Sequence, residues 1–153
     1  MKNLVIGQSG GPTAVINASL CGAVQAWEEA GQEGRVYGMP TGIAGFLADQ
    51  VTDLTALSEE ELKLLRLTPA AYLGSCRFKL PEDLTDAVYS AVFDNFREMN
   101  IGYFLYVGGN DSMDTVDKLS RFAAWTGSDV RFIGIPKTID NDLVLTDHTP
   151  GFG

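Results

Sequence analysis

The sequence has few residues of the kinds that mark metal-binding, disulfide-rich or membrane-spanning proteins. It contains two cysteines, Cys21 and Cys76, and one histidine, His148. Two isolated thiols match no metal-ligand spacing and are typical of packing residues in a reducing compartment. Nothing near His148 completes a nucleophile arrangement, so we interpret it as structural. No apolar run approaches the roughly 20 residues that span a bilayer, and the first residues turn polar too quickly for a signal peptide. We therefore expect a cytoplasmic protein without a membrane partner.

Basic residues are also scarce. Eleven lysines and arginines face 20 aspartates and glutamates, which gives a formal net charge of -9. This charge repels polyanions at long range, so nucleic acid is excluded as an expected partner. Small phosphates are still possible ligands, because backbone amides, a metal ion or one local lysine can hold them. With 153 residues, 45% of them hydrophobic, the chain can bury the core of one ordinary domain.

Short apolar runs alternate with helix-like patterns along the chain. Ser58 and Glu61 have the spacing of a capping box, which predicts the start of one helix, and residues 40–45 are typical of a turn. Strands are predicted at 4–6, 36–39, 103–107 and 130–135, and helices at 14–30, 58–67, 80–99 and 113–124. The alternation predicts a doubly wound α/β fold, with a mostly parallel sheet and helices on both faces.

Three loops that follow predicted strands are rich in Gly, Asp, Asn, Ser and Thr. Because loops at the carboxyl ends of parallel strands meet at one edge of the sheet, we expect these three to build one site. In the first, residues 7–13, Gly10 and Gly11 let the backbone approach an anion at the start of a helix. This loop lacks the Walker and dinucleotide-binding patterns, and an ordinary tight turn explains it equally well.

The second and third loops add charged and hydroxyl side chains. In residues 108–112, paired glycines separate a strand from a helix, although Asp111 and Ser112 can also be explained as caps of that helix. Residues 136–142 combine a cation, a hydroxyl and two carboxylates. In an extended loop Asp140 and Asp142 point the same way and can divide the tasks of proton acceptor and metal partner; a solvated acidic turn is the alternative.

Five segments of the chain resemble motifs of the phosphofructokinase family in order and spacing. They are 7–17, 73–77, 108–112, 136–142 and 146–152, and the fourth is close to specific for that family. The resemblance covers essentially the whole chain. It implies that residues 1–153 form the amino-terminal, phosphoryl-donor-binding domain of a glycolytic 6-phosphofructokinase, which phosphorylates the 1-hydroxyl of fructose 6-phosphate. It also implies that the sugar-phosphate-binding half is absent from this chain, so the chain alone can be inactive, and that the full-length protein is a homo-oligomer.

The resemblance also implies roles for individual residues. Asp140 matches the catalytic base, and Thr138 and Asp142 match positions that line the transfer site. Lys137 is grouped with them as a fourth catalytic residue. The residues implied to bind the phosphoryl donor are Gly10, Gly11, Arg77, Gly108, Gly109, Asp111 and Ser112. Such an arrangement suits phosphoryl transfer, in which catalysis consists mostly of positioning and of stabilising negative charge.

Two positions bear on the donor. Family members that use ATP usually have glycine where this chain has Asp111 and Lys137, whereas pyrophosphate users resemble this chain at both. A carboxylate at position 111 would crowd and repel the α-phosphate of a nucleotide, and Lys137 can neutralise a smaller donor. We therefore expect pyrophosphate, with ATP as the alternative donor and Mg²⁺ as the accompanying metal.

The chain departs from the family pattern in two places that affect these expectations. Asn110 occupies the place of an aspartate that engages Mg²⁺, so Asp111 is the nearest substitute ligand. Residues 14–15 replace a usual Pro-Gly pair in the first loop. A non-catalytic phosphate-binding or interaction module is therefore a second alternative. A kinase of lipids or dinucleotides is a third, which explains the second loop but not residues 136–142.

Overall fold

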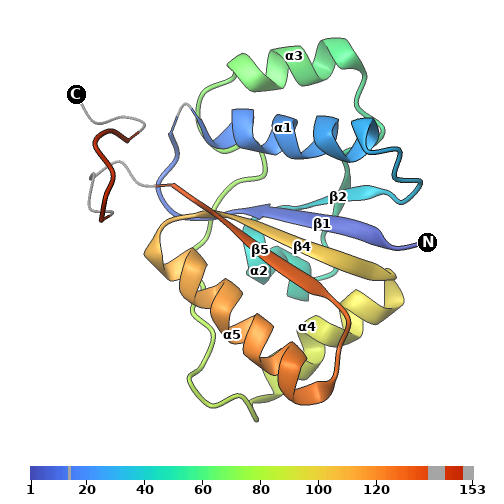
Figure 1. The fold of residues 1–153 in the computed structure, drawn as a ribbon, viewed down its shortest axis with the longest axis vertical. Coiled ribbons are helices and arrows are strands. Elements are labelled where there is room, and N and C mark those ends of the chain that lie inside the picture. Colours follow the sequence, from blue (N-terminus) through green and yellow to red (C-terminus); the bar gives the residue numbers. More distant parts are fainter. Residues whose placement is uncertain (14, 138–143, 150–153) are drawn as a thin grey trace.

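The computed structural model describes residues 1–13, 15–137 and 144–149. Within them, five strands form one sheet in the order β3-β2-β1-β4-β5 (Figure 1). Neighbouring strands run parallel, except that β2 and β3 pair antiparallel at one edge. In chain order the elements are β1 (Asn3–Gln8), α1 (Ile16–Glu29), β2 (Val36–Met39), α2 (Gly42–Leu47), β3 (Thr52–Asp53), α3 (Glu59–Leu67), α4 (Ala87–Glu98), β4 (Ile101–Gly108), α5 (Asn110–Thr126) and β5 (Arg131–Pro136). The predicted mostly parallel sheet is confirmed.

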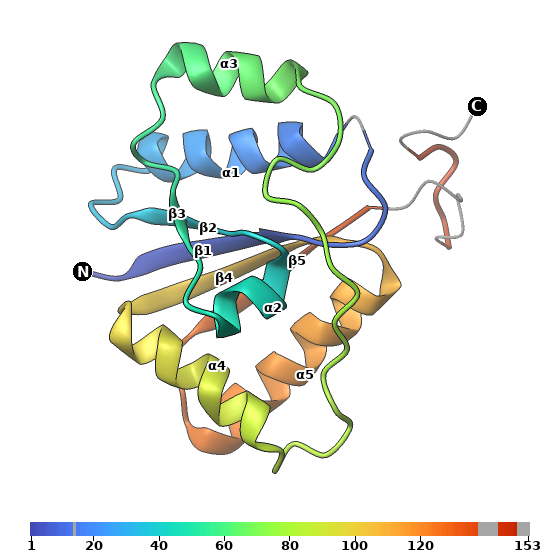
Figure 2. The same cartoon turned by 180° about the vertical axis from the view of Figure 1, so that it is seen from behind.

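Helices cover both faces of the sheet, as predicted. α1 and α3 lie on one face, and α2, α4 and α5 lie on the other (Figures 1 and 2). The central strand β1 is apolar on both sides. Leu4 and Ile6 pack with residues of α1 and α3, whereas Val5 between them packs with residues of α4 and α5. Alternation of side chains along the strand therefore gives each helical layer its own apolar surface.

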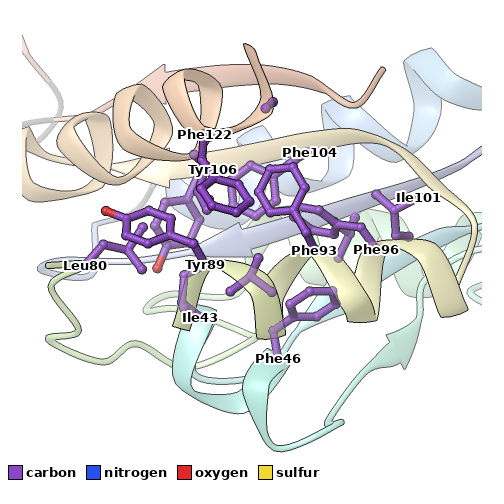
Figure 3. Close-up of a cluster of buried hydrophobic side chains, with 14 of the residues drawn as sticks. Ile43, Phe46, Leu80, Tyr89, Phe93, Phe96, Ile101, Phe104, Tyr106 and Phe122 are labelled. Atoms are coloured by element: carbon purple, nitrogen blue, oxygen red, sulfur yellow. The ribbon is translucent and has the colours of Figure 1, made fainter. Parts of the chain in front are cut away.

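An aromatic cluster fills the space between α4, α5 and the sheet (Figure 3). The rings of Phe93 in α4 and Phe122 in α5 have centroids 4.8 Å apart, and those of Phe96 in α4 and Phe104 in β4 are 5.7 Å apart. Burying each such side chain stabilises the fold by about 1.5–3 kcal/mol. The cluster fixes α5 against the sheet, and α5 begins at the edge where the predicted loops converge.

Two of the predicted helix starts are wrong, each for a local reason. No helix begins near Leu80. α4 starts instead at Ala87, directly after its N-cap Asp86, whose carboxylate accepts a hydrogen bond from the Val88 N–H at 2.9 Å. Before it, the carbonyls of Leu80 and Pro81 accept hydrogen bonds from the side chains of Lys118 and Tyr89 instead of from a helical backbone. α5 starts at Asn110 rather than near Met113, and Gly109 is its N-cap.

Two short elements, the helix α2 and the edge strand β3, were not predicted. The turn predicted at 40–45 is confined to its beginning, where Thr41 has a φ of 53°, and α2 follows at once. β3 has only 2 residues, too few for an alternating pattern. The capping box of α3 is confirmed, since Ser58 and Glu61 bond to each other's backbone N–H groups at 2.8 and 3.3 Å. Among the helices that the structure describes, none has the length and apolar character to cross a membrane.

Candidate functional site

A cavity of about 760 Å³ lies at the carboxyl ends of β1 and β4. It is bounded by three segments, one from the loop after β1, one from the loop after β4 and the first turn of α5, and one from residues 75–79. Its lining residues are Ser9, Gly10, Gly11, Pro12, Ser75, Cys76, Arg77, Phe78, Lys79, Gly109, Asn110, Asp111 and Ser112. The structure therefore brings the first two predicted loops together, as expected for parallel strands.

Lys137 connects the beginning of the third loop to the other two. Its backbone N–H donates to the Gly108 carbonyl at 2.9 Å, and its ammonium donates to the Gly11 carbonyl. Lys137 is buried. Gly10 beside it has a φ of 78°, which favours glycine, and a Cβ there would lie 3.6 Å from the lysine Nζ. A buried positive charge thus lies directly against the backbone of the first glycine loop.

The second loop places the amino terminus of α5 at the cavity. Gly108 has no room for a side chain, since a Cβ there would come within 2.0 Å of the Ser112 Oγ and 2.9 Å of the Ser9 carbonyl oxygen. Ser112 is buried, and its N–H donates to the Gly109 carbonyl at 3.0 Å. Helix N-termini carry partial positive charge and favour bound anions. The N-cap of α5 is Gly109, and Asp111 and Ser112 lie within the first turn of the helix, so the interpretation of these two residues as the N-cap is wrong.

The third wall is a segment that ends at Lys79. Ser75 donates from its Oγ to the Gly10 carbonyl at 2.8 Å, which joins this segment to the first loop. The Lys79 ammonium forms an ion pair with the Asp111 carboxylate at 3.2 Å, across the cavity mouth. The sequence reasoning named Arg77 but missed Ser75 and Lys79. The signal that could have found Lys79 is its place two residues after Arg77, because side chains two apart in an extended segment share a face.

Beneath the first loop lies a buried polar network that the sequence reasoning also missed. The Gln8 amide donates to the Ile16 carbonyl at 3.1 Å and to the Asn17 Oδ1 at 2.9 Å, and it accepts from the Leu73 N–H at 2.9 Å. The Asn17 amide in turn donates to the Thr68 carbonyl at 2.9 Å and accepts from the Tyr72 N–H at 2.8 Å. Both side chains belong to fully buried residues. The network sets the position of residues 68–73, and so of the wall that follows them.

The described part of the site carries both signs of charge. Arg77 and Lys79 supply cations at the cavity lining, and Asp111 supplies one carboxylate. Burial raises the pKa of the Tyr106 phenol above its usual 10. Across the described residues, no three acidic, cysteine or histidine side chains gather as metal ligands would.

The predicted site residues divide into three groups. Those that line the cavity are Gly10, Gly11, Arg77, Gly109, Asn110, Asp111 and Ser112. Lys137 and Gly108 adjoin it through the contacts above. Thr138, Asp140 and Asp142 lie outside the described residues, so their assigned roles stay predictions.

Comparison with known proteins gives consistent matches over the whole chain. Residues 3–153 match the family described as phosphofructokinase. The chain is 44% identical over 153 residues to a pyrophosphate–fructose 6-phosphate 1-phosphotransferase of Halomonas elongata, covering 99% of this chain and 36% of that protein. It is 30% identical over 152 residues to an ATP-dependent 6-phosphofructokinase of Yersinia enterocolitica, covering 99% and 42%. A solved pyrophosphate-dependent phosphofructokinase from Nitrosospira multiformis matches with a TM-score of 0.89 and 41% identity, covering 99% and 37%. The chain thus spans 36–42% of the length of these relatives.

Proposed function

The chain belongs to the phosphofructokinase family, and we propose that the protein containing it transfers a phosphoryl group from pyrophosphate to the 1-hydroxyl of fructose 6-phosphate. The observation that carries this proposal is the charged arrangement around the glycine loops. Lys137 is buried against the Gly11 carbonyl, while Asp111 at the mouth is paired with Lys79. These contacts occur at the two positions where ATP users of the family usually have glycine.

Pyrophosphate fits this arrangement better than a nucleotide. A diphosphate needs cations and N–H donors around both of its phosphorus atoms, and the cavity offers Arg77, Lys79 and the amino terminus of α5. An ATP molecule would extend its α-phosphate and nucleoside beyond this centre, where the Asp111 carboxylate repels the phosphate. The relatives agree with this preference, since identity to the pyrophosphate-dependent enzyme is 44% and to the ATP-dependent enzyme 30%.

In the proposed reaction this chain binds and orients the donor. The backbone at Gly10 and Gly11 and the N-terminus of α5 hold its phosphates, while Arg77 and Lys137 offset the charge that spreads over the transferring group. Asp140 accepts the proton of the sugar 1-hydroxyl. The oxygen of that hydroxyl then forms a bond to the terminal phosphorus, the bridging P–O bond breaks, and orthophosphate leaves. By the family resemblance, Thr138 and Asp142 contact the sugar side or assist the metal and the base.

Mg²⁺ is part of this proposal as a companion of the donor. Around the cavity, the side-chain oxygens suited to it are those of Asp111 and Asn110. One carboxylate and one amide fit a metal that keeps waters and binds mainly to donor phosphates, rather than a cage built by the protein. When bound, Mg²⁺ would neutralise negative charge on the phosphates.

The test uses the full-length protein with fructose 6-phosphate and either Mg-pyrophosphate or Mg-ATP, following fructose 1,6-bisphosphate. We expect turnover with pyrophosphate only. Asp140→Asn should lower kcat by about 10²–10⁴-fold, the usual contribution of a general base, while leaving pyrophosphate binding by calorimetry unchanged. Turnover with ATP in place of pyrophosphate would overturn the donor assignment. A folded protein that uses neither donor would favour the non-catalytic phosphate-binding module.

A further inference from the structure

Residues 75–82 form a segment that crosses from the cavity to α5, and we refer to it as the strap. Its first five residues line the cavity, including Arg77 and Lys79. One end is joined to the first glycine loop by the Ser75–Gly10 hydrogen bond of 2.8 Å. The strap lies outside the regular elements, so no ladder of backbone hydrogen bonds fixes its path. Whatever holds its other end decides where its two cations lie.

That other end is held by Lys118, a lysine buried inside the protein. Its side chain is only 4% exposed, and its ammonium donates to the Leu80 carbonyl at 3.1 Å and to the Glu82 carboxylate at 2.6 Å. A third acceptor is the carboxylate of Asp114, one turn earlier on α5, at 2.8 Å. A buried ammonium is stable only when its donors are satisfied, and here two of the three partners belong to the strap. Its partners also raise the pKa of Lys118, so the charge persists across the physiological range.

The same face of α5 also meets the strap at the cavity. Asp111 and Lys118 are separated by seven residues, or about two helical turns and 10 Å along the axis. Asp111 pairs with Lys79 at 3.2 Å, and Lys118 bonds the carbonyl of the next residue, Leu80. The Leu80 side chain is buried in the aromatic cluster near Tyr89, as Figure 3 shows. The Tyr89 hydroxyl donates to the Pro81 carbonyl. α5 therefore carries both the amino terminus at the donor cavity and the anchor for the opposite wall.

We propose that Lys118 is a positioning residue for the phosphoryl donor: it holds the strap on α5 so that Arg77 and Lys79 face the cavity before the donor arrives. This inference rests on the proposed function, because it names residues that serve the donor site. Its physical basis is the entropy of ordering. Immobilising long side chains and a loop during binding lowers affinity, and a wall fixed in advance avoids that loss. Removal of Lys118 should therefore weaken donor binding without changing the reacting groups.

The test compares Lys118→Met with a matched control, Arg121→Met, in the full-length protein. Both changes remove a cation from α5. Arg121, however, is exposed, and its ion pair with Asp117 of the same helix is long, at 3.8 Å. We expect Lys118→Met to raise the KM for Mg-pyrophosphate about tenfold, with kcat and the KM for fructose 6-phosphate changed less than about twofold. Arg121→Met should change none of them. Lys118→Arg, which keeps a cation with several donors, should restore part of the affinity.

Limited trypsin digestion gives a second readout that does not depend on activity, because Arg77 and Lys79 are trypsin sites within the strap. In Lys118→Met, cleavage after these two residues should be faster than in the wild type, while cleavage elsewhere in the domain should not change. Glu82→Gln weakens one contact between Lys118 and the strap and leaves the buried Lys118 side chain in place, since the Glu82 side chain is 86% exposed. It should loosen the strap in the same way, to a smaller degree. If Lys118→Met does not fold, this variant carries the test.

The outcomes separate this inference from the proposed function. A wild-type protein that does not use pyrophosphate would defeat the proposed function, and with it the donor role of Lys118, even if the strap is cleaved faster in the variant. With an active wild type, faster cleavage confined to the strap together with a raised donor KM supports the inference. An unchanged donor KM, unchanged strap cleavage, or faster cleavage over the whole chain overturns it, because Lys118 would then serve stability alone.

Discussion

Replacement of Asn17 by alanine tests whether the buried polar network holds the first loop and the wall of the cavity together. The Asn17 side chain takes part in three hydrogen bonds, with the Gln8 amide, the Thr68 carbonyl and the Tyr72 N–H, at 2.8–2.9 Å. Each such bond contributes about 1 kcal/mol, and a buried group left without its partner costs about 1–3 kcal/mol. Because water can reach some of these groups after the change, we expect a loss of about 3–5 kcal/mol in the free energy of unfolding.

Urea denaturation of the full-length protein, followed by circular dichroism, measures this change. The matched control is Asn95→Ala, since within the described residues the Asn95 side chain makes a single hydrogen bond, to the Phe46 carbonyl at 2.7 Å. Its loss should lower stability by about 1 kcal/mol. A loss in Asn17→Ala no larger than that in the control would refute the reasoning. It would mean that residues 68–73 hold their position without the network.

Two further predictions concern the second glycine loop and the capping box. Gly108→Ala should destabilise the protein by about 1–3 kcal/mol in urea denaturation, because the added Cβ meets the buried Ser112 side chain at 2.0 Å. Gly109→Ala, where the nearest atom is 3.6 Å away, is the control, and equal losses would contradict the steric argument. Hydrogen bonds from the backbone N–H and the hydroxyl of Ser58 hold the pKa of Glu61 below its usual 4.5. Its ionised form therefore stabilises α3 above about pH 4.5, and this contribution is lost as the pH falls through the lowered pKa. In Glu61→Gln, thermal unfolding scanned from about pH 3 to 7 should show less loss of stability on acidification; an unchanged profile would contradict it.

The fold and the core of the site followed from patterns that depend on local chemistry. Short apolar runs located β1 and β4, and the glycine pairs after them located the first two loops of the candidate site. The start of α4 was wrong because the pattern before it contains apolar residues that pack, such as Leu80, without being helical. Lys79 and Lys118 were missed because their roles depend on partners far along the chain, the carboxylate of Asp111 and the carbonyl of Leu80. Contacts of that kind exist only once the fold has brought the segments together.

A net charge of -9 is compatible with binding a small anion because the relevant field is local. At physiological ionic strength charges more than about 8 Å apart are largely screened, so exposed carboxylates elsewhere on the domain act weakly on a bound phosphate. The cavity has Arg77 and Lys79 in its lining, together with the first turn of α5, and Lys137 lies against Gly11. Asp111 is the carboxylate in this group, and its pairing with Lys79 at 3.2 Å offsets its charge. Under the proposed function an incoming donor competes for this lysine, so the balance between the ion pair and the donor phosphates would set donor selectivity.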